Sequence, residues 1–410
     1  MAQKFKENNY EIVEFEKNAD IYIVNTCTVT SISDKKSRQY LRRAKQLNPN
    51  SIVIAIGCYA EVAKEELCKI DEIDLVLGNN EKNSIFEIVQ EYLEYHKEDC
   101  IITDVNKQKE YLDFGTTTYT EKTRAIIKIQ DGCNNFCTYC LIPYARGRIR
   151  SRHPENIINE TSKIVEQGIQ EVVLTGIHIA SYGKDFNNNY TLIDLLENIN
   201  KIEGLKRIRL GSLEPNLITE EFVERLSKLD KICEHFHLSL QSGCNETLKR
   251  MNRKYSIEEF EKCTKILRDK FKDVALTTDI IVGFPGETEE EFNTTYNFLK
   301  DIKFSKMHVF KYSPRKGTVA AKMENQIDPQ IKEERSHRLI ELSNNYEKEF
   351  LTQYIGKKVK VLFEEKEGEF YKGHTKNYMV IKVKGQDLEN KIKEVEILKC
   401  SNLELIGKVN

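Results

Sequence analysis

Long apolar runs are absent from this 410-residue sequence, and so is any excess of charge of one sign. No stretch approaches the 18 or more apolar residues that a membrane-spanning helix requires, which argues against a membrane protein. The N-terminus, MAQKFKENNY, lacks the apolar core of a signal peptide, so we expect a cytoplasmic protein. The formal net charge is −2, and a nucleic-acid partner would therefore have to bind local basic patches.

Cysteine, by contrast, is plentiful, with 11 residues. The odd number argues against a disulfide framework, and a chain long enough to bury two or three cores does not need one. We therefore expect the cysteines to hold metal clusters or to remain reduced. Four of them are interpreted as packing residues: Cys233, Cys244, Cys263 and Cys400.

Three cysteines stand out by their spacing, Cys133-x-x-x-Cys137-x-x-Cys140, within DGCNNFCTYC. Three thiolates can bind three irons of a cubane 4Fe–4S cluster, which leaves the fourth iron open to an exogenous ligand. One alternative is a structural zinc site, but zinc normally takes four protein ligands and the only histidine nearby is His153. Another is three unrelated core thiols. The spacing favours an iron–sulfur cluster with one open iron.

Strand and helix patterns divide the chain into three parts. Residues 1–120 contain the short runs IYIVN (21–25), SIVIAIG (51–57) and LVLG (75–78), which predict a small doubly wound α/β domain. Residues 121–353 hold six strand patterns with helices between them, as in a partial (β/α)6 barrel. Residues 354–410 form short strand patterns with turns, which predict a small all-β barrel.

The carboxyl ends of parallel strands are where such folds place reacting groups. The cysteine motif directly follows the first predicted barrel strand, residues 124–130. Cys27 and Cys58 each follow a strand of the N-terminal domain, so their thiols can converge. The alternative for these two is a pair of inert buried thiols.

Taken together, these motifs resemble those of the radical-SAM tRNA methylthiotransferases, and particularly the branch acting on N6-threonylcarbamoyladenosine. The stretches that carry the resemblance are NTCTVTSISDKKSRQ (25–39), IGCYAE (56–61), DGCNNFCTYCLIPYARG (131–147), LTGIH (174–178), LQSG (240–243) and DIIVGFPGETEEEF (279–292). The resemblance covers almost the whole chain. It implies an α/β chain with an auxiliary-cluster domain, a radical-SAM barrel and a C-terminal RNA-binding TRAM barrel.

The resemblance also implies roles for particular residues. Cys133, Cys137 and Cys140 would hold the radical-generating 4Fe–4S cluster, and Cys27 and Cys58 would bind an auxiliary 4Fe–4S cluster that carries the sulfur. One S-adenosylmethionine (SAM) would methylate that sulfur. A second would supply the 5′-deoxyadenosyl radical that takes hydrogen from C2 of the adenine at tRNA position 37, and the methylthio group would join this carbon. Electrons would come from a donor such as flavodoxin or ferredoxin.

Six residues are candidate SAM contacts: Tyr139, Thr175, Gly176, Ser212, Glu214 and Gln241. Tyr139 lies where radical-SAM enzymes place an aromatic residue beside the SAM adenine, and the other five end predicted strands. Simple packing is the alternative for Tyr139. Capping of the next helix is the alternative for Ser212, Glu214 and Gln241.

The start of the chain departs from the family pattern. Family members begin with a strand, a first cysteine and a helix, whereas this sequence opens within what resembles the second half of that helix. The expected first ligand of the auxiliary cluster is therefore missing, and its possible substitutes, Cys68 and Cys100, lie outside ligand-like motifs. One alternative function follows from this, an inactive tRNA-binding iron–sulfur protein with an incomplete auxiliary cluster. A second alternative, independent of the start, is the sister activity, methylthiolation of an aspartate of a ribosomal protein.

Contacts with the anticodon loop of tRNA are expected in two places. In YARGRIRSR (144–152), arginines at alternate positions would point the same way in an extended segment and suit RNA phosphates, unless they pair with acids. In the C-terminal module, tyrosines among basic residues suit base stacking, unless they cover the barrel core. The candidate RNA-binding residues are Arg146, Arg148, Tyr371, Lys376 and Tyr378.

Overall fold

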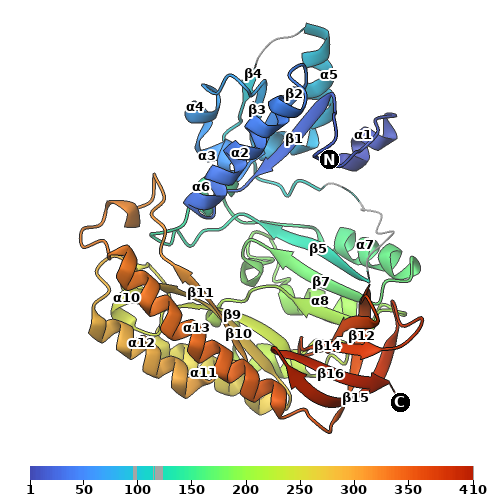
Figure 1. Ribbon diagram of the computed structural model, residues 1–410, viewed down its shortest axis with the longest axis vertical. Helices are drawn as coiled ribbons and strands as arrows, with labels where there is room; N and C mark the ends of the chain where they lie inside the picture. Colours follow the sequence, from blue (N-terminus) through green and yellow to red (C-terminus); the bar gives the residue numbers. More distant parts are fainter. Residues whose placement is uncertain (96–98, 114, 116–122, 410) are drawn as a thin grey trace. The chain divides into compact units, whose positions relative to one another are not determined.

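The computed structural model describes residues 1–95, 99–113, 115 and 123–409, and Figure 1 labels its helices and strands. The chain forms two compact units. The first consists of Met1–Phe114, Asp131–Arg150 and Ser313–Lys322, and the second of Gly115–Gln130, Ser151–Tyr312 and Met323–Asn410. The loop with the three closely spaced cysteines therefore belongs to the same unit as the N-terminal domain, although the sequence pattern assigned it to the barrel segment.

A parallel four-stranded sheet forms the centre of the first unit. Its strands are β1 (Ile21–Thr26), β2 (Ile52–Gly57), β3 (Leu75–Leu77) and β4 (Asp99–Ile101), in that spatial order. Its helices are α1 (Ala2–Glu7), α2 (Ser31–Leu47), α3 (Cys58–Val62), α4 (Lys64–Leu67), η1 (Asn80–Asn83), α5 (Ile85–Tyr95), α6 (Ile142–Arg146) and η4 (Ala320–Lys322). The strands are short and rich in β-branched residues, as is usual for parallel strands buried on both faces.

Alternate residues of β2 pack on opposite faces of this sheet. Val53 and Ala55 belong to a buried cluster that includes residues of α2, α3 and α4. Ile54 and Ile56 belong to a second cluster, which includes residues of α1 and α5. Helices therefore cover both faces, and the doubly wound architecture expected from the sequence is confirmed.

The expectation that every cysteine is a ligand or reduced is wrong for two of them. Cys68, at the end of α4, and Cys100, in β4, form a disulfide with a Cα–Cα distance of 6.5 Å. The two are 32 residues apart in sequence and meet only because β4 pairs with β3 at the sheet edge near α4. Both sulfurs are used in this bond, so neither cysteine is a substitute cluster ligand in this structure.

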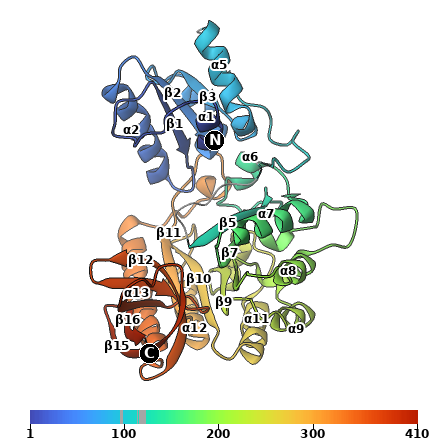
Figure 2. The same cartoon turned by 90° about the vertical axis from the view of Figure 1, so that its right-hand side faces the viewer.

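Seven strands in two connected sheets form the open barrel of the second unit (Figure 2). One sheet has the order β6 (Arg150–Ser151), β5 (Arg124–Asp131), β7 (Glu171–Gly176) and β8 (Arg207–Leu210). The other has the order β11 (Lys306–Lys311), β10 (Ala275–Val282) and β9 (His235–Gln241). Isolated parallel bridges, such as Leu213 with Leu238, join the two sheets. The six long strands are those expected from the sequence, and the partial barrel is confirmed.

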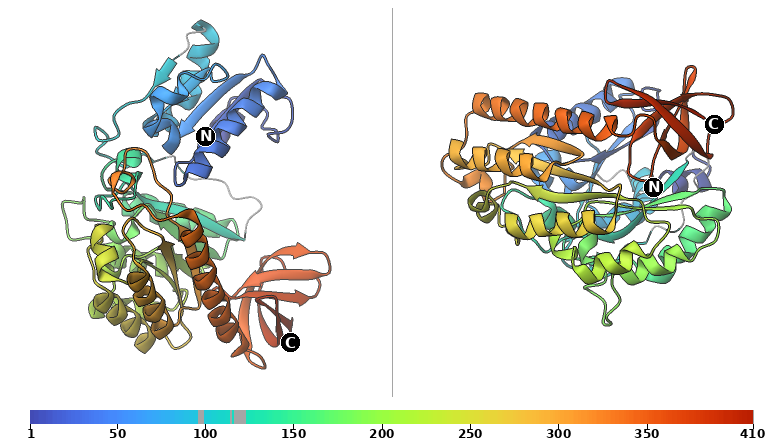
Figure 3. Two further views of the ribbon diagram at one scale, coloured as in Figure 1. Left: turned by 60° about the vertical axis from the view of Figure 1, so that its left-hand side comes forward. Right: turned by 90° about the horizontal axis from the view of Figure 1, so that it is seen from below.

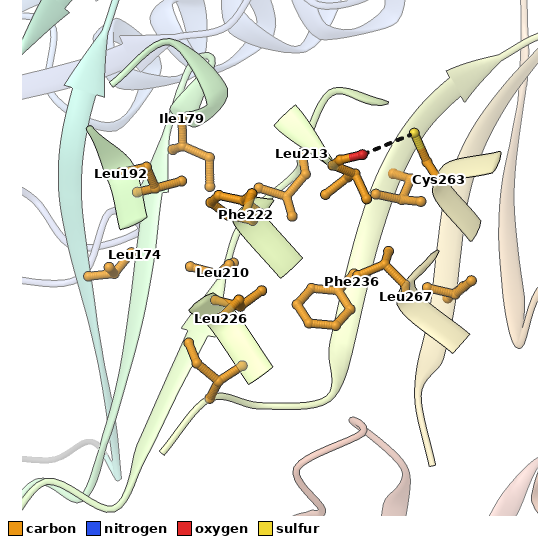
Figure 4. Close-up of a cluster of buried hydrophobic side chains, with 14 of the residues drawn as sticks. Leu174, Ile179, Leu192, Leu210, Leu213, Phe222, Leu226, Phe236, Cys263 and Leu267 are labelled. Carbon is orange, nitrogen blue, oxygen red and sulfur yellow. Dashed lines mark hydrogen bonds between the residues drawn. The ribbon is translucent and has the colours of Figure 1, made fainter. Parts of the chain in front are cut away.

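Helices cover the outside of this half-barrel. They are α7 (Pro154–Glu166), η2 (Ile179–Ser181), α8 (Leu192–Asn200), η3 (Pro215–Leu217), α9 (Glu220–Ser227), α10 (Asn245–Arg250), α11 (Ile257–Lys270), α12 (Glu289–Ile302) and α13 (Pro329–Thr352). Leu174, Leu210, Phe222 and Phe236 pack in the shared core, and Figure 4 shows Cys263 among them. Cys233, Cys244 and Cys263 are buried, as expected of packing residues. No helix of the described residues has the length and apolar character to cross a bilayer.

A closed five-stranded barrel follows α13 (Figure 3). Its strands are β12 (Lys358–Glu367), β13 (Phe370–His374), β14 (Val380–Lys384), β15 (Ile392–Ser401) and β16 (Glu404–Val409), in the order β12-β13-β14-β16-β15. The small all-β barrel expected for residues 354–410 is therefore confirmed.

The C-terminal barrel is attached to the half-barrel by two arginines of β8. Arg207 donates hydrogen bonds to the carbonyls of His374 (2.8 Å) and Lys360 (3.0 Å). Arg209 donates to the carbonyls of Lys376 (3.0 Å) and Thr375 (3.2 Å). These contacts join the start of a half-barrel strand to the backbone of the C-terminal barrel within one compact unit.

Candidate iron–sulfur and nucleotide sites

The cysteine loop begins where β5 ends. Gly132, between Asp131 and Cys133, has a φ of +73°, and a Cβ on it would lie 1.8 Å from the carbonyl oxygen of Arg148. Cys133 N–H donates to the Gly147 carbonyl at 3.0 Å, which closes the loop on itself. Only glycine permits this close approach of the two backbone segments.

The three thiols of this loop are half-buried, and those of Cys133 and Cys140 have backbone donors nearby. Asn135 N–H points at Cys133 Sγ (3.5 Å), and Ile142 N–H points at Cys140 Sγ (3.4 Å). Hydrogen bonds to ligand sulfurs are a usual feature of iron–sulfur sites. Among the described residues, no three histidine, cysteine or carboxylate side chains are already gathered as a metal site. The fit to a cluster therefore rests on the three-thiol donor set and on these sulfur-directed N–H groups.

Cys27 and Cys58 follow the paired ends of two neighbouring strands. Thr26 of β1 and Gly57 of β2 are partners in the parallel register, so the two cysteines leave the sheet side by side. Thr26 Oγ1 donates to the Ile56 carbonyl (2.9 Å) and accepts from Ala60 N–H (3.1 Å), which fixes the start of α3. Cys27 is exposed and Cys58 is half-buried. This placement fits two thiolate ligands of one cluster.

The expected row of four arginines is not formed. Arg146 Nε donates to Cys58 Sγ (3.0 Å), and Arg150 is buried, with its guanidinium 3.7 Å from Asp131. Arg152, in the second unit, is buried and paired with Glu160. The prediction failed because the segment is not extended: α6 occupies 142–146 and Gly147 turns the chain at a φ of +72°.

Arg148 is the exposed arginine of these four. Its guanidinium lies 4.7 Å from the centroid of the Phe136 ring, and Phe136 in turn contacts Tyr144 edge to face at 5.6 Å. Tyr144 is half exposed. The cysteine loop thus carries a surface group made of exposed Arg148 and Tyr144 and the half-buried ring of Phe136, while Arg146 is directed at a cysteine.

Five of the candidate SAM residues lie at or just beyond the carboxyl ends of strands in the second unit. Thr175 and Gly176 end β7, and Ser212 and Glu214 follow β8. A Cβ on Gly176 would lie 2.8 Å from the Gln130 carbonyl, so this position also requires close backbone approach. Gln241 ends β9 with a φ of +70°.

The structure adds two residues to this strand-end group. Glu214 is paired with Arg253 at 2.6 Å, and His178 Nε2 lies 3.9 Å from the same carboxylate. Burial lowers the pKa of His178, although Glu214 opposes this shift. Arg253 could not be recognised from the sequence, because it follows α10 with no motif around it, whereas His178 ends the LTGIH stretch that carried the resemblance. Tyr139 lies in the cysteine loop, in the first unit.

The two C-terminal tyrosines differ: Tyr371 is buried, as the packing alternative expects, whereas Tyr378 is 40% exposed. Tyr371 is buried in the core of the closed barrel. The Tyr378 ring stacks on His374 (4.7 Å) and His235 (4.9 Å), with the Arg209 guanidinium 4.6 Å from its centroid. Lys376 is half-buried, and its ammonium donates to the Asp230 carbonyl.

Two family models match the chain. Residues 127–299 match the Radical SAM superfamily, and residues 1–78 match the Uncharacterized protein family UPF0004. Among solved structures, the radical S-adenosylmethionine methyltransferase TsrM from Kitasatospora setae has a TM-score of 0.57 at 16% identity, with 75% of this chain and 66% of that chain covered. This likeness supports the fold.

Curated relatives match over nearly the full length. The threonylcarbamoyladenosine tRNA methylthiotransferases MtaB of Bacillus subtilis and Aquifex aeolicus are 45% and 41% identical, each over 97% of this chain and over 90% and 95% of their own lengths. The tRNA-2-methylthio-N(6)-dimethylallyladenosine synthase of Clostridium botulinum is 35% identical over 100% of this chain and 92% of its own length. The chain therefore belongs to the radical-SAM tRNA methylthiotransferases, in their threonylcarbamoyladenosine branch.

Proposed function

We propose that this protein transfers a methylthio group to C2 of N6-threonylcarbamoyladenosine at position 37 of tRNA. One observation carries the proposal: the loop of Cys133, Cys137 and Cys140 belongs to the same compact unit as the strand ends that hold Cys27 and Cys58. The reaction needs both a radical source and a sulfur carrier, and one unit contains thiols for both. The names of the more similar relatives support the choice of nucleoside.

We assign Cys133, Cys137 and Cys140 to the radical-generating cluster. With SAM at its open iron, such a cluster supplies an electron that yields the 5′-deoxyadenosyl radical. Gly132 lets the loop close next to β5, and the N–H groups of Asn135 and Ile142 stabilise negative charge on the sulfurs.

We assign SAM binding to the strand ends of the half-barrel and to Tyr139. Thr175 and Gly176 provide a polar group and a backbone that a ligand can approach closely. The Glu214–Arg253 pair is placed to fix a charged donor and a charged acceptor near the ends of β8 and β9. Ser212 and Gln241 complete this set.

Cys27 and Cys58 are assigned to an auxiliary 4Fe–4S cluster that provides the sulfur. The two thiols leave adjacent strands in register, so a single cluster can be bound by both. The electron for radical generation is assigned to a small donor protein of the flavodoxin or ferredoxin type. The cytoplasm, where tRNA is modified, is the proposed place of action.

We propose that the anticodon loop contacts the surface group on the cysteine loop. Arg148, stacked on Phe136, presents a planar cation with its donor groups outward, which suits a phosphate or an unpaired base. Tyr144 is exposed beside it and can stack on a base. In the C-terminal barrel, the exposed ring of Tyr378 is the candidate for a base contact, and the half-buried Lys376 is the candidate for a phosphate contact.

The proposal is tested by analysing tRNA nucleosides from a strain in which the gene is deleted and then restored. Loss of 2-methylthio-N6-threonylcarbamoyladenosine, and its recovery with the wild type but not with Cys133→Ala, is expected. Loss of the dimethylallyl derivative instead would assign the other nucleoside, and added mass on a ribosomal protein would assign the protein substrate. An unchanged tRNA profile in a strain without a second such gene would contradict the proposal.

Iron and sulfide analysis of the purified protein separates the two cluster assignments. After anaerobic reconstitution, two cubane clusters correspond to about eight irons per chain, and Cys133→Ala is expected to lower this to about four. About four irons in the wild type and almost none in the variant would mean that only the radical cluster is present. This chain would then be the inactive tRNA-binding protein described above.

A further inference from the structure

Arg146 has a side chain that is directed at the auxiliary site. Its Nε–H group donates to Cys58 Sγ at 3.0 Å, and its Nη1 lies 3.6 Å from the carboxylate of Asp131. Only 19% of the side chain is exposed. Both partners belong to the same compact unit as Arg146. The guanidinium is therefore placed between a cysteine of the N-terminal domain and the residue that precedes the cysteine loop.

The backbone around Arg146 is fixed by further hydrogen bonds. Arg150 Nη2 donates to the carbonyl of Arg146 at 2.8 Å. The side-chain amide of Asn79 donates to the carbonyl of Ala145 at 2.8 Å and lies 3.9 Å from Cys58 Sγ. The end of α6 is thus held against the start of α3, and the approach of Arg146 to Cys58 does not depend on one flexible side chain.

A role in RNA contact does not explain this geometry. An arginine that grips a phosphate presents its planar fork to solvent, whereas the Nε and Nη1 edges of Arg146 are used by Cys58 and Asp131. Arg148, two residues further along, is the exposed one. The two arginines of the same short segment therefore have different partners and, we infer, different tasks.

A cationic N–H donor beside a ligand sulfur has a defined effect on an iron–sulfur cluster. Reduction adds negative charge, which a hydrogen bond to sulfur and a nearby positive charge both stabilise. The reduction potential rises in consequence. Groups that contact a ligand rather than the metal also fix the orientation of that ligand.

We propose that Arg146 is a positioning residue of the auxiliary cluster. Its hydrogen bond and charge at Cys58 raise the reduction potential of that cluster, and its side chain fixes Cys58 relative to the loop of Cys133, Cys137 and Cys140. This inference rests on the proposed function, because it takes Cys58 as a ligand of the auxiliary cluster.

The test uses the full chain with Cys133, Cys137 and Cys140 all changed to alanine, so that only the auxiliary cluster is measured. Its midpoint potential is determined by a redox titration followed by electron paramagnetic resonance. Arg146→Gln, which removes the charge, is expected to shift the potential to a more negative value. Arg146→Lys keeps the charge but not the Nε–H group, and is expected to fall between Gln and the parent. Arg148→Gln is the matched control and should leave the potential unchanged.

The outcomes separate this inference from the function on which it rests. A parent protein that binds no iron would contradict the auxiliary-site assignment itself, and the inference with it. A parent that binds a cluster whose potential is the same in Arg146→Gln would overturn the inference alone. If Arg146→Gln does not retain a cluster, the Arg146→Lys variant is measured instead. A midpoint potential in Arg146→Lys equal to that of the parent would also overturn the inference.

Discussion

One buried carboxylate, Glu171, is paired with two buried arginines in this protein. Glu171 is fully buried at the start of β7, and the arginines of β8 surround it. Arg209 Nε donates to its carboxylate at 2.8 Å, and Arg207 approaches the other oxygen at 3.5 Å. Since these arginines also hold the C-terminal barrel, one carboxylate neutralises two cations that connect two parts of the unit.

Removal of this carboxylate should therefore be costly. We expect Glu171→Gln to lower the free energy of unfolding by about 3 kcal/mol, because it leaves buried arginines without a counter-charge. Glu197→Gln, which breaks an exposed pair with Arg225, should cost less than about 1 kcal/mol. Urea denaturation of both variants measures the difference. An equal loss of unfolding free energy in Glu171→Gln and Glu197→Gln would show that the buried carboxylate contributes no more to stability than the exposed one.

His235 gives stability a dependence on pH. Burial, with the neighbouring Arg209, lowers the pKa of this histidine to about 3. The unfolded chain takes up a proton near pH 6.5 and the folded protein does not, so stability falls as the pH drops below about 6.5.

His235→Phe keeps an aromatic ring next to Tyr378 but cannot titrate. Between pH 7.5 and pH 5 the wild type should lose about 1 to 2 kcal/mol more stability than this variant. Denaturation at the two pH values is the measurement, with His337→Phe, on an exposed histidine of α13, as the control. A parallel loss in wild type and His235→Phe would refute the assignment.

The direction in which each arginine of residues 144–152 points could not be predicted from the sequence. Their alternate spacing predicts one common direction only if the backbone is extended. Gly147 and α6 break that condition, so Arg146 and Arg148 have different surroundings although they are two positions apart. Tyr371 is a similar case: it stands between Phe370 and the basic Lys372, and the strand alternation that buries it follows from the barrel. The cysteine spacing could be recognised because its chemistry is local.

At the level of loops, one glycine decides whether the cysteine loop can close. Gly132 has a positive φ, and an added Cβ would collide with the backbone of Arg148 and Gly147. Gly168, after α7, also has a positive φ of +90°, but a Cβ there would meet no atom within 4 Å. An alanine at Gly132 would therefore suffer both an unfavourable φ and a steric clash, whereas an alanine at Gly168 would suffer only the unfavourable φ.

Gly132→Ala is therefore expected to impair cluster binding more than Gly168→Ala. The first variant must move the backbone that positions Cys133, and its iron content after reconstitution should fall well below that of the wild type. The second should cost about 1 kcal/mol of stability and retain its iron. Iron per chain, measured in parallel for both, is the comparison. Unchanged iron in Gly132→Ala would mean that the loop adapts.

The regular elements followed from sequence patterns more closely than the contacts between them. The short β-branched runs identify β1 to β3 and the half-barrel strands because parallel strands buried on both faces require such residues. The disulfide between Cys68 and Cys100 could not be predicted, since it depends on the sheet-edge position of β4. The hydrogen bonds from the arginines of β8 to the C-terminal barrel could not be predicted either, because no sequence motif distinguishes Arg207 and Arg209 from other strand residues.

At the level of the whole molecule, the C-terminal barrel is part of a larger compact unit. It shares that unit with the half-barrel, and carbonyls of β12, of His374 and of the turn after β13 accept hydrogen bonds from the arginines of β8. The ring of Tyr378 adds a stacked contact with His235. A barrel fixed in this way presents its exposed lysines at a constant position relative to the half-barrel strands.

Arg209→Met should loosen this attachment without unfolding the barrel, whose core contains only its own strands and the end of α13. The variant loses the hydrogen bonds to Thr375 and Lys376. Two exposed lysines at the junction of α13 and β12, Lys357 and the first strand residue Lys358, should then be cut by trypsin several-fold faster than in the wild type, releasing the barrel as a fragment. Arg225→Met, which removes a surface pair, is the control and should be cut at the wild-type rate. Identical cleavage rates in Arg209→Met and wild type would show that the barrel is held by other contacts, because an attachment that depends on Arg209 cannot survive its removal unchanged.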